Sequence, residues 1–400
     1  MGKTVLEYIN ENWDICTKEN REDCGTLIGL PYPYTVSAVG FFDEMYYWGT
    51  YFTNTGLILS DRQWLEKCNT DNMLYMVNRY GYMPNGNRTF YLKCSQPPVL
   101  SMMVRDIYEY YRDGLWLGTA YKMLEKEYSF WMTKRITPIG LNTYGGDISG
   151  EEHGLAKGYS ERVHFRPEGT DEEIARHCIM VGESGWDMTP RFGNRGYNFA
   201  PVDLNALMYG FERNMEYFSA ELELGEDKIW SERAEIRKAK MLKYMESEEG
   251  FLLDYNFADG TQSKILSAAS FLPLLTGAAD GRNIRAIPKL LGSLETEYGI
   301  LTCEKNSTEG NYQWDYPNGW PCLQQLTVSA LLRCGYTEDA KRIAKKYIDL
   351  ADRVFAESGE LWEKYNVADG SIRVTDEYKM PPIMGWSAAA YLVFSALLKD

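Results

Sequence analysis

Apolar residues recur along most of the chain at helical spacing, every three to four positions. The segments with this spacing come in pairs, separated by loops rich in Gly, Pro, Asn and Asp. Strand-like alternation of apolar and polar residues is scarce, so the pattern predicts an all-α protein. The clearest helical segments are 99–111, 115–134, 202–221, 228–246, 287–297, 323–334, 337–358 and 385–398.

The number and pairing of these segments predict how the helices are arranged. Roughly ten to twelve helices, at about 33 residues each with their loops, suit six hairpins in a double ring better than a small bundle. Residues 250–260 resemble residues 359–370, which predicts the same kind of loop after two different helices. Because no Pro- or Ser-rich linker divides the chain, we expect one domain over residues 1–400, with residues 137–169 as a long functional loop.

The charge balance restricts the partners. With 57 acidic and 42 basic residues, the chain carries a formal charge of −15, which argues against a nucleic acid or an anionic membrane surface. The longest apolar run, 388–398, is only about half of the roughly 20 residues that a membrane span requires. The first 20 residues lack the basic and apolar segments of a signal peptide, and the eight cysteines form no CxxC pair, so we expect free thiols and a cytoplasmic location.

Sequence signatures for cofactors and metals are missing. The chain has no GxGxxG after a strand, no GxxxxGK[ST] and no HExxH, and it contains only three histidines. A Ser-His-Asp triad is also disfavoured, because no GxSxG motif is present. We therefore expect neither a metal nor a cofactor.

Acidic residues instead occur in loops rich in Trp, Tyr, Gly and Pro. Desolvation beside an indole ring raises a carboxyl pKa, as a general acid near neutral pH requires, while a second, ionised carboxylate can act as a base. Any one of these acids alone is more often a helix cap or an ion-pair partner. Four such loops in a helical protein with 30 Tyr and 11 Trp together favour a saccharide site. The loops are 44–48, 182–187, 313–320 and 361–366.

One of these loops carries a specific family resemblance. The segment Gln313-Trp314-Asp315-Tyr316-Pro317-Asn318-Gly319-Trp320 resembles the second signature of the trehalases, family 37 of the glycoside hydrolases. Four further blocks follow the family's order, so the resemblance covers about residues 30–395. It implies an (α/α)6 barrel. The four blocks are 44–48, 84–98, 183–187 and 363–365.

The resemblance also implies roles for individual residues. Asp187 matches the family's general acid and Glu363 its general base, and an inverting pair of this kind stands about 6.5–9.5 Å apart. Arg166 and Glu168 resemble the family's Arg-x-Glu substrate clamp. The complete set of expected substrate contacts is Trp48, Asn85, Gln96, Arg166, Glu168, Trp186, Trp314, Asp315, Trp320 and Glu377.

The chain departs from the family at positions that bind sugar. Phe41 and Cys94 stand where trehalases have arginines, and Gly49 stands where they have an aspartate. A charge-assisted contact of this kind contributes roughly 1.5–3 kcal/mol, so its loss weakens binding of the family's usual disaccharide. We therefore expect an inverting α-glycosidase that acts on a small α-glucoside, with altered specificity.

Three alternatives remain open from the sequence. The first is a true α,α-trehalase. The second is a carbohydrate-binding protein that kept the barrel and lost turnover, although binding alone does not require both Asp187 and Glu363. The third is an isomerase or lyase on a similar barrel, although such enzymes usually use His or Tyr as the base. The sequence does not determine the oligomeric state.

Overall fold

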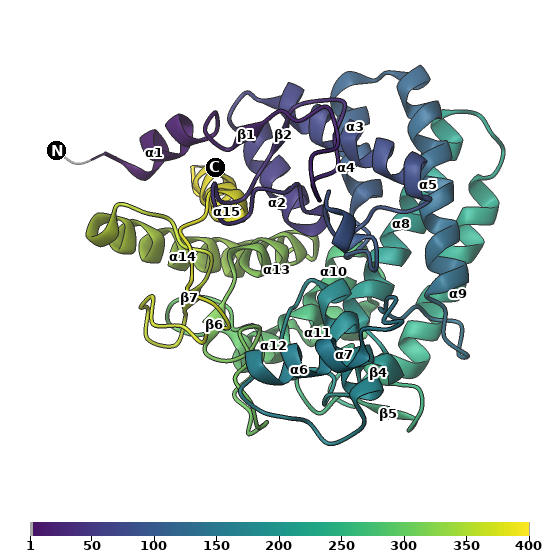
Figure 1. Ribbon diagram of the computed structural model, residues 1–400, viewed down its shortest axis with the longest axis vertical. Helices are drawn as coiled ribbons and strands as arrows, with labels where there is room; N and C mark the ends of the chain where they lie inside the picture. The colour runs from purple at the N-terminus through teal and green to yellow at the C-terminus, as the bar shows by residue number, and fades with distance from the viewer. Residues whose placement is uncertain (1–2, 400) are drawn as a thin grey trace.

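The computed structural model describes residues 3–399 and confirms the helical double ring (Figure 1). Six helices form a closed inner ring, because each packs against the next and the last returns to the first. The arrangement is an (α/α)6 barrel. In ring order the inner helices are α2 (Tyr47–Ile58), α4 (Leu100–Tyr111), α8 (Val202–Glu221), α10 (Leu272–Thr276), α13 (Pro321–Arg333) and α15 (Gly385–Leu397).

The remaining helices form the outer layer and one additional hairpin. The hairpin consists of α6 (Glu152–Arg162) and α7 (Asp171–Ser184), which pack against each other. Among residues 3–399, no helix has the length and apolar character needed to cross a bilayer. The other helices are α1 (Val5–Asn12), α3 (Gln63–Tyr80), α5 (Gly114–Lys134), α9 (Asp227–Met245), α11 (Gly281–Arg285), α12 (Ile287–Leu294) and α14 (Thr337–Ser358).

The strands are two residues long and join loops rather than forming a layer. All of them pair in antiparallel fashion. The pair β6–β7 aligns Asn318 with Asn366 and therefore brings the 313–320 loop beside the 361–366 loop. The strands are β1 (Thr17–Lys18), β2 (Tyr34–Thr35), β3 (Phe199–Ala200), β4 (Tyr255–Asn256), β5 (Thr261–Gln262), β6 (Asn318–Gly319) and β7 (Tyr365–Asn366).

All eight helical segments predicted from periodicity are helices in the structure, with ends shifted by three residues at most. Helix α2 gave no amphipathic signal, because it lies in the inner ring and is buried on almost every face. At Gly56 an added Cβ would lie 2.8 Å from the Cα of Ala389, so this glycine allows α2 and α15 to approach closely. The expected loop at 137–169 is only partly a loop, because it contains α6.

The resemblance between residues 250–260 and 359–370 corresponds to one local structure formed twice. The side-chain oxygen of Asn256 accepts hydrogen bonds from the backbone N–H groups of residues 258 and 259. Asn366 does the same for residues 368 and 369. Each copy pairs with a short strand that leads directly into an inner helix, α8 in the first case and α13 in the second.

A buried ion cluster joins the segment after α7 to the first turn of α8 and to the residue before β4. The guanidinium of Arg191 donates to both carboxylate oxygens of Asp254, at 3.0 and 2.8 Å, and to Asp203 at 2.8 Å. All three side chains are at most 2% exposed. Asp254 also accepts a hydrogen bond from the backbone N–H of Val202, at the first turn of α8. The cluster therefore fixes the segment around Arg191 to the start of an inner helix.

Replacing Arg191 with Met should lower the free energy of unfolding by about 3–5 kcal/mol, because two carboxylates would stay buried without their cation. Urea unfolding followed by circular dichroism at pH 7 measures this change. The control is Arg195→Met, an exposed arginine in the same segment, which should change stability by less than about 0.5 kcal/mol. Equal effects of the two substitutions would contradict a stabilising role for the cluster.

Candidate active site

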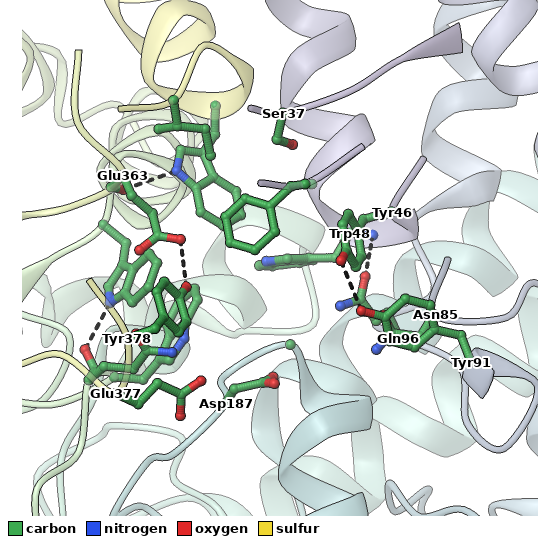
Figure 2. Close-up of a pocket in the computed structure, with 18 residues that line it drawn as sticks. Ser37, Tyr46, Trp48, Asn85, Tyr91, Gln96, Asp187, Glu363, Glu377 and Tyr378 are labelled. Atoms are coloured by element: carbon green, nitrogen blue, oxygen red, sulfur yellow. Dashed lines mark hydrogen bonds between the residues drawn. The ribbon is translucent and has the colours of Figure 1, made fainter. Parts of the chain in front are cut away.

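A cavity of about 270 Å³ lies where inner helices α2, α13 and α15 begin (Figure 2). Trp48 belongs to the first turn of α2, Trp320 immediately precedes α13, and Trp386 belongs to the first turn of α15. The remaining wall comes from the segments 37–46 and 85–96, the loop after α7, and the segments 313–320 and 361–383. The barrel thus holds loops that are distant in sequence around one hollow.

Three acidic side chains line this cavity, namely Asp187, Glu363 and Glu377. In Figure 2, Glu377 and Asp187 lie next to each other below Glu363 and Tyr378, and Trp48, Asn85 and Gln96 occupy the opposite side. The side chain of Glu377 is 5% exposed, and its Oε2 atom accepts no hydrogen bond within the described chain. Carboxyl groups crowded in this way favour protonation of one of them.

The backbone around Asp187 is sharply turned. Helix α7 ends at Ser184, and Gly185 adopts a left-handed conformation with φ of +71°. Met188, directly after the acid, is also left-handed, with φ of +58°, which is uncommon for a residue with a side chain. Its carbonyl accepts a hydrogen bond from the backbone N–H of Trp314 at 3.1 Å. These turns hold Asp187 at the cavity wall and tie it to the 313–320 loop.

Burial raises the pKa of Asp187 and of Glu377 above their ordinary values, and the charge of Asp187 raises the pKa of Glu377 further. The guanidinium of Arg162, at the end of α6, opposes this effect and lowers both pKa values. Its Nη1 atom lies 4.0 Å from Oε1 of Glu377. Sequence reasoning missed Arg162, because it belongs to no recognised block.

Glu363 has a different environment from Asp187. Its Oε1 accepts a hydrogen bond from the hydroxyl of Tyr378 at 2.7 Å, and its Oε2 accepts one from Nζ of Lys364 at 2.8 Å. Lys364 is fully buried, and it also lies 2.9 Å from Asp376 and 4.8 Å from the ring centre of Trp320. The base predicted from the sequence is thus one half of a buried ion pair.

Aromatic and amide side chains form much of the remaining wall. The rings of Trp314 and Trp320 are stacked, with centroids 3.8 Å apart, and Trp386 meets both edge-on. Across the cavity, Gln96 accepts a hydrogen bond from the backbone N–H of Trp48 at 2.9 Å. The indole N–H of Trp48 is buried and has no acceptor within residues 3–399.

The structure brings most of the predicted site residues together at this cavity. Those that line it are Trp48, Asn85, Gln96, Asp187, Trp314, Trp320, Glu363 and Glu377. Two others lie behind the wall. Trp186 packs against Trp314 with the guanidinium of Arg191 over its ring, and Asp315 accepts a hydrogen bond from Asn306. Burial raises the pKa of Asp315 to about 6.

Arg166 and Glu168 do not reach the cavity. Both are exposed, and Arg166 pairs with Asp171 at the start of α7. They belong to the connection between α6 and α7, which faces solvent in this structure. None of residues 137–169, all of which the structure describes, lines the cavity. The expected long loop therefore contributes through Arg162, behind the wall.

Several residues that line the cavity were not among the predicted contacts. Tyr46 and Tyr378 stand inside the sequence blocks that carry the resemblance or directly beside a predicted contact, so the sequence held a signal for them. Tyr91 likewise stands inside the block 84–98. Phe42 and Trp386 gave no comparable signal, because a single aromatic residue in a sequence indicates packing as often as binding. Within residues 3–399, no group of three or more His, Cys, Asp or Glu is placed to hold a metal ion.

Comparison with known proteins identifies the family. The trehalase family model matches residues 3–398, nearly the whole chain. The chain belongs to the trehalase family. It is therefore a glycoside hydrolase on an (α/α)6 barrel.

Solved structures agree with this assignment. Neutral trehalase Nth1 from Saccharomyces cerevisiae is 27% identical with a TM-score of 0.79, over 99% of this chain and 80% of that one. A GH63 mannosylglycerate hydrolase from Thermus thermophilus in complex with Tris is 16% identical with a TM-score of 0.64, over 90% of this chain and 96% of that one. The second likeness shows a shared fold only.

The crowding of Glu377 predicts a pH-dependent cost in stability. The pKa of Glu377 is raised on folding. Its contribution to the free energy of unfolding is therefore fully present at low pH and is lost as pH rises above the ordinary value of 4.5. Glu377→Gln should therefore raise the free energy of unfolding at pH 9 by roughly 1–3 kcal/mol and change it little near pH 4. Urea unfolding at the two pH values measures the difference.

The matched control is Glu172→Gln, an exposed residue on α7. Its substitution should give the same small change at both pH values. A Glu377→Gln variant that is less stable than the wild-type protein at pH 9 would contradict the burial of an uncompensated charge.

Proposed function

We propose that the protein is an inverting α-glycosidase that acts on a small α-glucoside, with Asp187 as general acid and Glu363 as general base. The observation that carries this proposal is the contrast between two acids on one cavity. Burial raises the pKa of Asp187, which favours a protonated donor, whereas Glu363 is paired with the ammonium of Lys364. Acid and base roles are separated by such differences in environment.

In the proposed reaction, Asp187 gives its proton to the glycosidic oxygen as the bond from that oxygen to the anomeric carbon breaks. Glu363 takes a proton from a water molecule, whose oxygen forms the new bond at the opposite face of the sugar. One water is consumed, the aglycone leaves as an alcohol, and the anomeric configuration is inverted. Proton exchange with solvent then restores both carboxyl groups.

The other residues on the cavity wall would bind the sugar. The stacked pair Trp314 and Trp320 offers an aromatic face for a sugar ring. Besides burial, the charge of Glu363 raises the pKa of Asp187 and would help this acid retain its proton. Asn85 and Gln96 would supply amide contacts from the far side.

A true α,α-trehalase is the second candidate, supported by the likeness to yeast neutral trehalase along 99% of this chain. The substitutions at family sugar-binding positions argue against it. Phe41 is 59% exposed, so the position occupied by an arginine in trehalases carries an apolar ring in contact with solvent. Trehalose belongs in any substrate panel for this reason.

Proton NMR of the reaction tests the mechanism directly. The wild-type protein should release β-glucose first from at least one α-glucoside, before mutarotation, because the reaction inverts the anomeric centre. Asp187→Asn and Glu363→Gln should each lower turnover by at least about a hundredfold. The control is Asp315→Asn, whose carboxyl lies outside the cavity. Early α-glucose would exclude inversion, and full activity in either catalytic variant would exclude the assigned roles.

The pH profile tests the role of Asp187 separately. A general acid works while protonated, so kcat/KM should fall as pH rises above the pKa of Asp187, which burial raises and Arg162 lowers. Arg162→Met should therefore move the alkaline limb of the profile to higher pH, by about one unit. Arg176→Met, an exposed arginine on α7, should leave the limb in place. A shift to lower pH in Arg162→Met would contradict the assignment.

A further inference from the structure

Five aromatic rings form a continuous series from the acidic side of the cavity to the opposite side (Figure 2), which we call the aromatic arc. Its members contact one another in the order Tyr378, Phe42, Tyr46, Tyr91 and Phe90, with centroids 6.0, 6.0, 5.5 and 4.6 Å apart. All contacts are edge-to-face. The first four line the cavity, and Phe90 is 49% exposed, so the arc runs from the cavity to the surface.

The tyrosine hydroxyl groups of the arc already form hydrogen bonds within the protein. The hydroxyls of Tyr46 and Tyr91 are hydrogen-bonded to each other at 2.8 Å, and Tyr46 also donates to Glu44. The hydroxyl of Tyr378 donates to Glu363. The arc therefore presents ring carbon to a ligand rather than free hydroxyl groups.

The charges around the cavity restrict the ligand further. Three carboxyl groups line it, and none of its lining residues, all within the described chain, is Lys or Arg. An anionic ligand group would meet no cationic side chain on the cavity wall. Lys364 contacts the cavity residues but is itself fully buried in its pairs with Glu363 and Asp376.

The size of the cavity indicates where the arc would act. At about 270 Å³ it is slightly smaller than typical ligand pockets of roughly 300–1,000 Å³. It suits a single sugar ring beside the acids, so that the rest of a substrate would extend over the arc toward Phe90.

We propose that the aromatic arc is the aglycone site of this enzyme and that it takes an uncharged apolar group, such as an alkyl chain. This inference rests on the proposed α-glucosidase function and adds the substrate class to it. A sugar aglycone needs hydrogen-bond partners, whereas an apolar aglycone gains from contact with ring carbon that is otherwise exposed to water.

A series of ethyl, butyl and hexyl α-glucosides tests this, because the leaving alcohols have similar reactivity and differ mainly in apolar surface. For the wild-type protein, kcat/KM should rise by up to about fourfold for each methylene that becomes buried, and at least about tenfold from the ethyl to the hexyl compound. A 5-carboxypentyl α-glucoside, which ends in a carboxylate, should react at least about tenfold more slowly than the hexyl compound.

Two variants connect the effect to the arc. Phe42→Ala removes a ring that makes no side-chain hydrogen bond, and it should reduce the hexyl-to-ethyl ratio of kcat/KM to about one third or less of the wild-type ratio. Tyr110→Ala removes a ring that is 59% exposed on α4 and does not line the cavity, and it should keep the wild-type ratio.

The possible outcomes distinguish a failure of the apolar aglycone site from a failure of the proposed α-glucosidase function. A hexyl-to-ethyl ratio near one, with the ethyl compound hydrolysed, would overturn the apolar aglycone site and leave the α-glucosidase function intact. If the hexyl-to-ethyl ratio of kcat/KM is above one but has the same value in the wild-type protein and in Phe42→Ala, the role of the arc is overturned. No hydrolysis of any member, nor of trehalose, would overturn the proposed function and the inference with it.

Discussion

The buried guanidinium of Arg191 is the contact on which the geometry of the site depends. It binds Asp203 in the first turn of α8 and the more distant Asp254, which also accepts a hydrogen bond from the backbone at the start of α8. Asp187 stands four residues before Arg191, in a segment that includes the left-handed Met188. Without a fixed anchor, a strained turn of this kind would relax. The ion cluster thus holds the segment that carries Asp187 in a fixed position.

Within the cavity, the carboxyl groups of Asp187 and Glu363 have different charged neighbours. Asp187 shares its surroundings with Glu377 and faces Arg162 at longer range, whereas Glu363 contacts an ammonium group directly. The glycoside hydrolase therefore keeps a concentration of negative charge in a place that would be more stable without it. This trade of stability for reactivity is common at active sites.

The fold could be predicted further than the site. Helices with one polar face, such as α14, were located correctly because periodicity records which face meets water. Helix α2 was not located, because a helix that is buried on almost every face has no polar face to produce a periodic pattern. At the site, the Trp-rich blocks predicted Trp314 and Trp320 as contacts, and both line the cavity. The expected clamp at Arg166 and Glu168 rested on a short motif whose spacing does not determine which way the connection turns, and both residues are exposed. Arg162 and Phe42 required the folded arrangement.

The loop that occurs twice, after α9 and after α14, holds a buried residue of opposite charge in its two copies. Counted from the shared Tyr-Asn pair, Asp254 in the first copy corresponds to Lys364 in the second. The anion in the first copy fixes Arg191, and the cation in the second pairs with Glu363. The backbone around both is alike. In such a barrel the sign of a buried charge can be exchanged without redesigning the loop, which gives a single scaffold the means to support either structure or chemistry at equivalent positions.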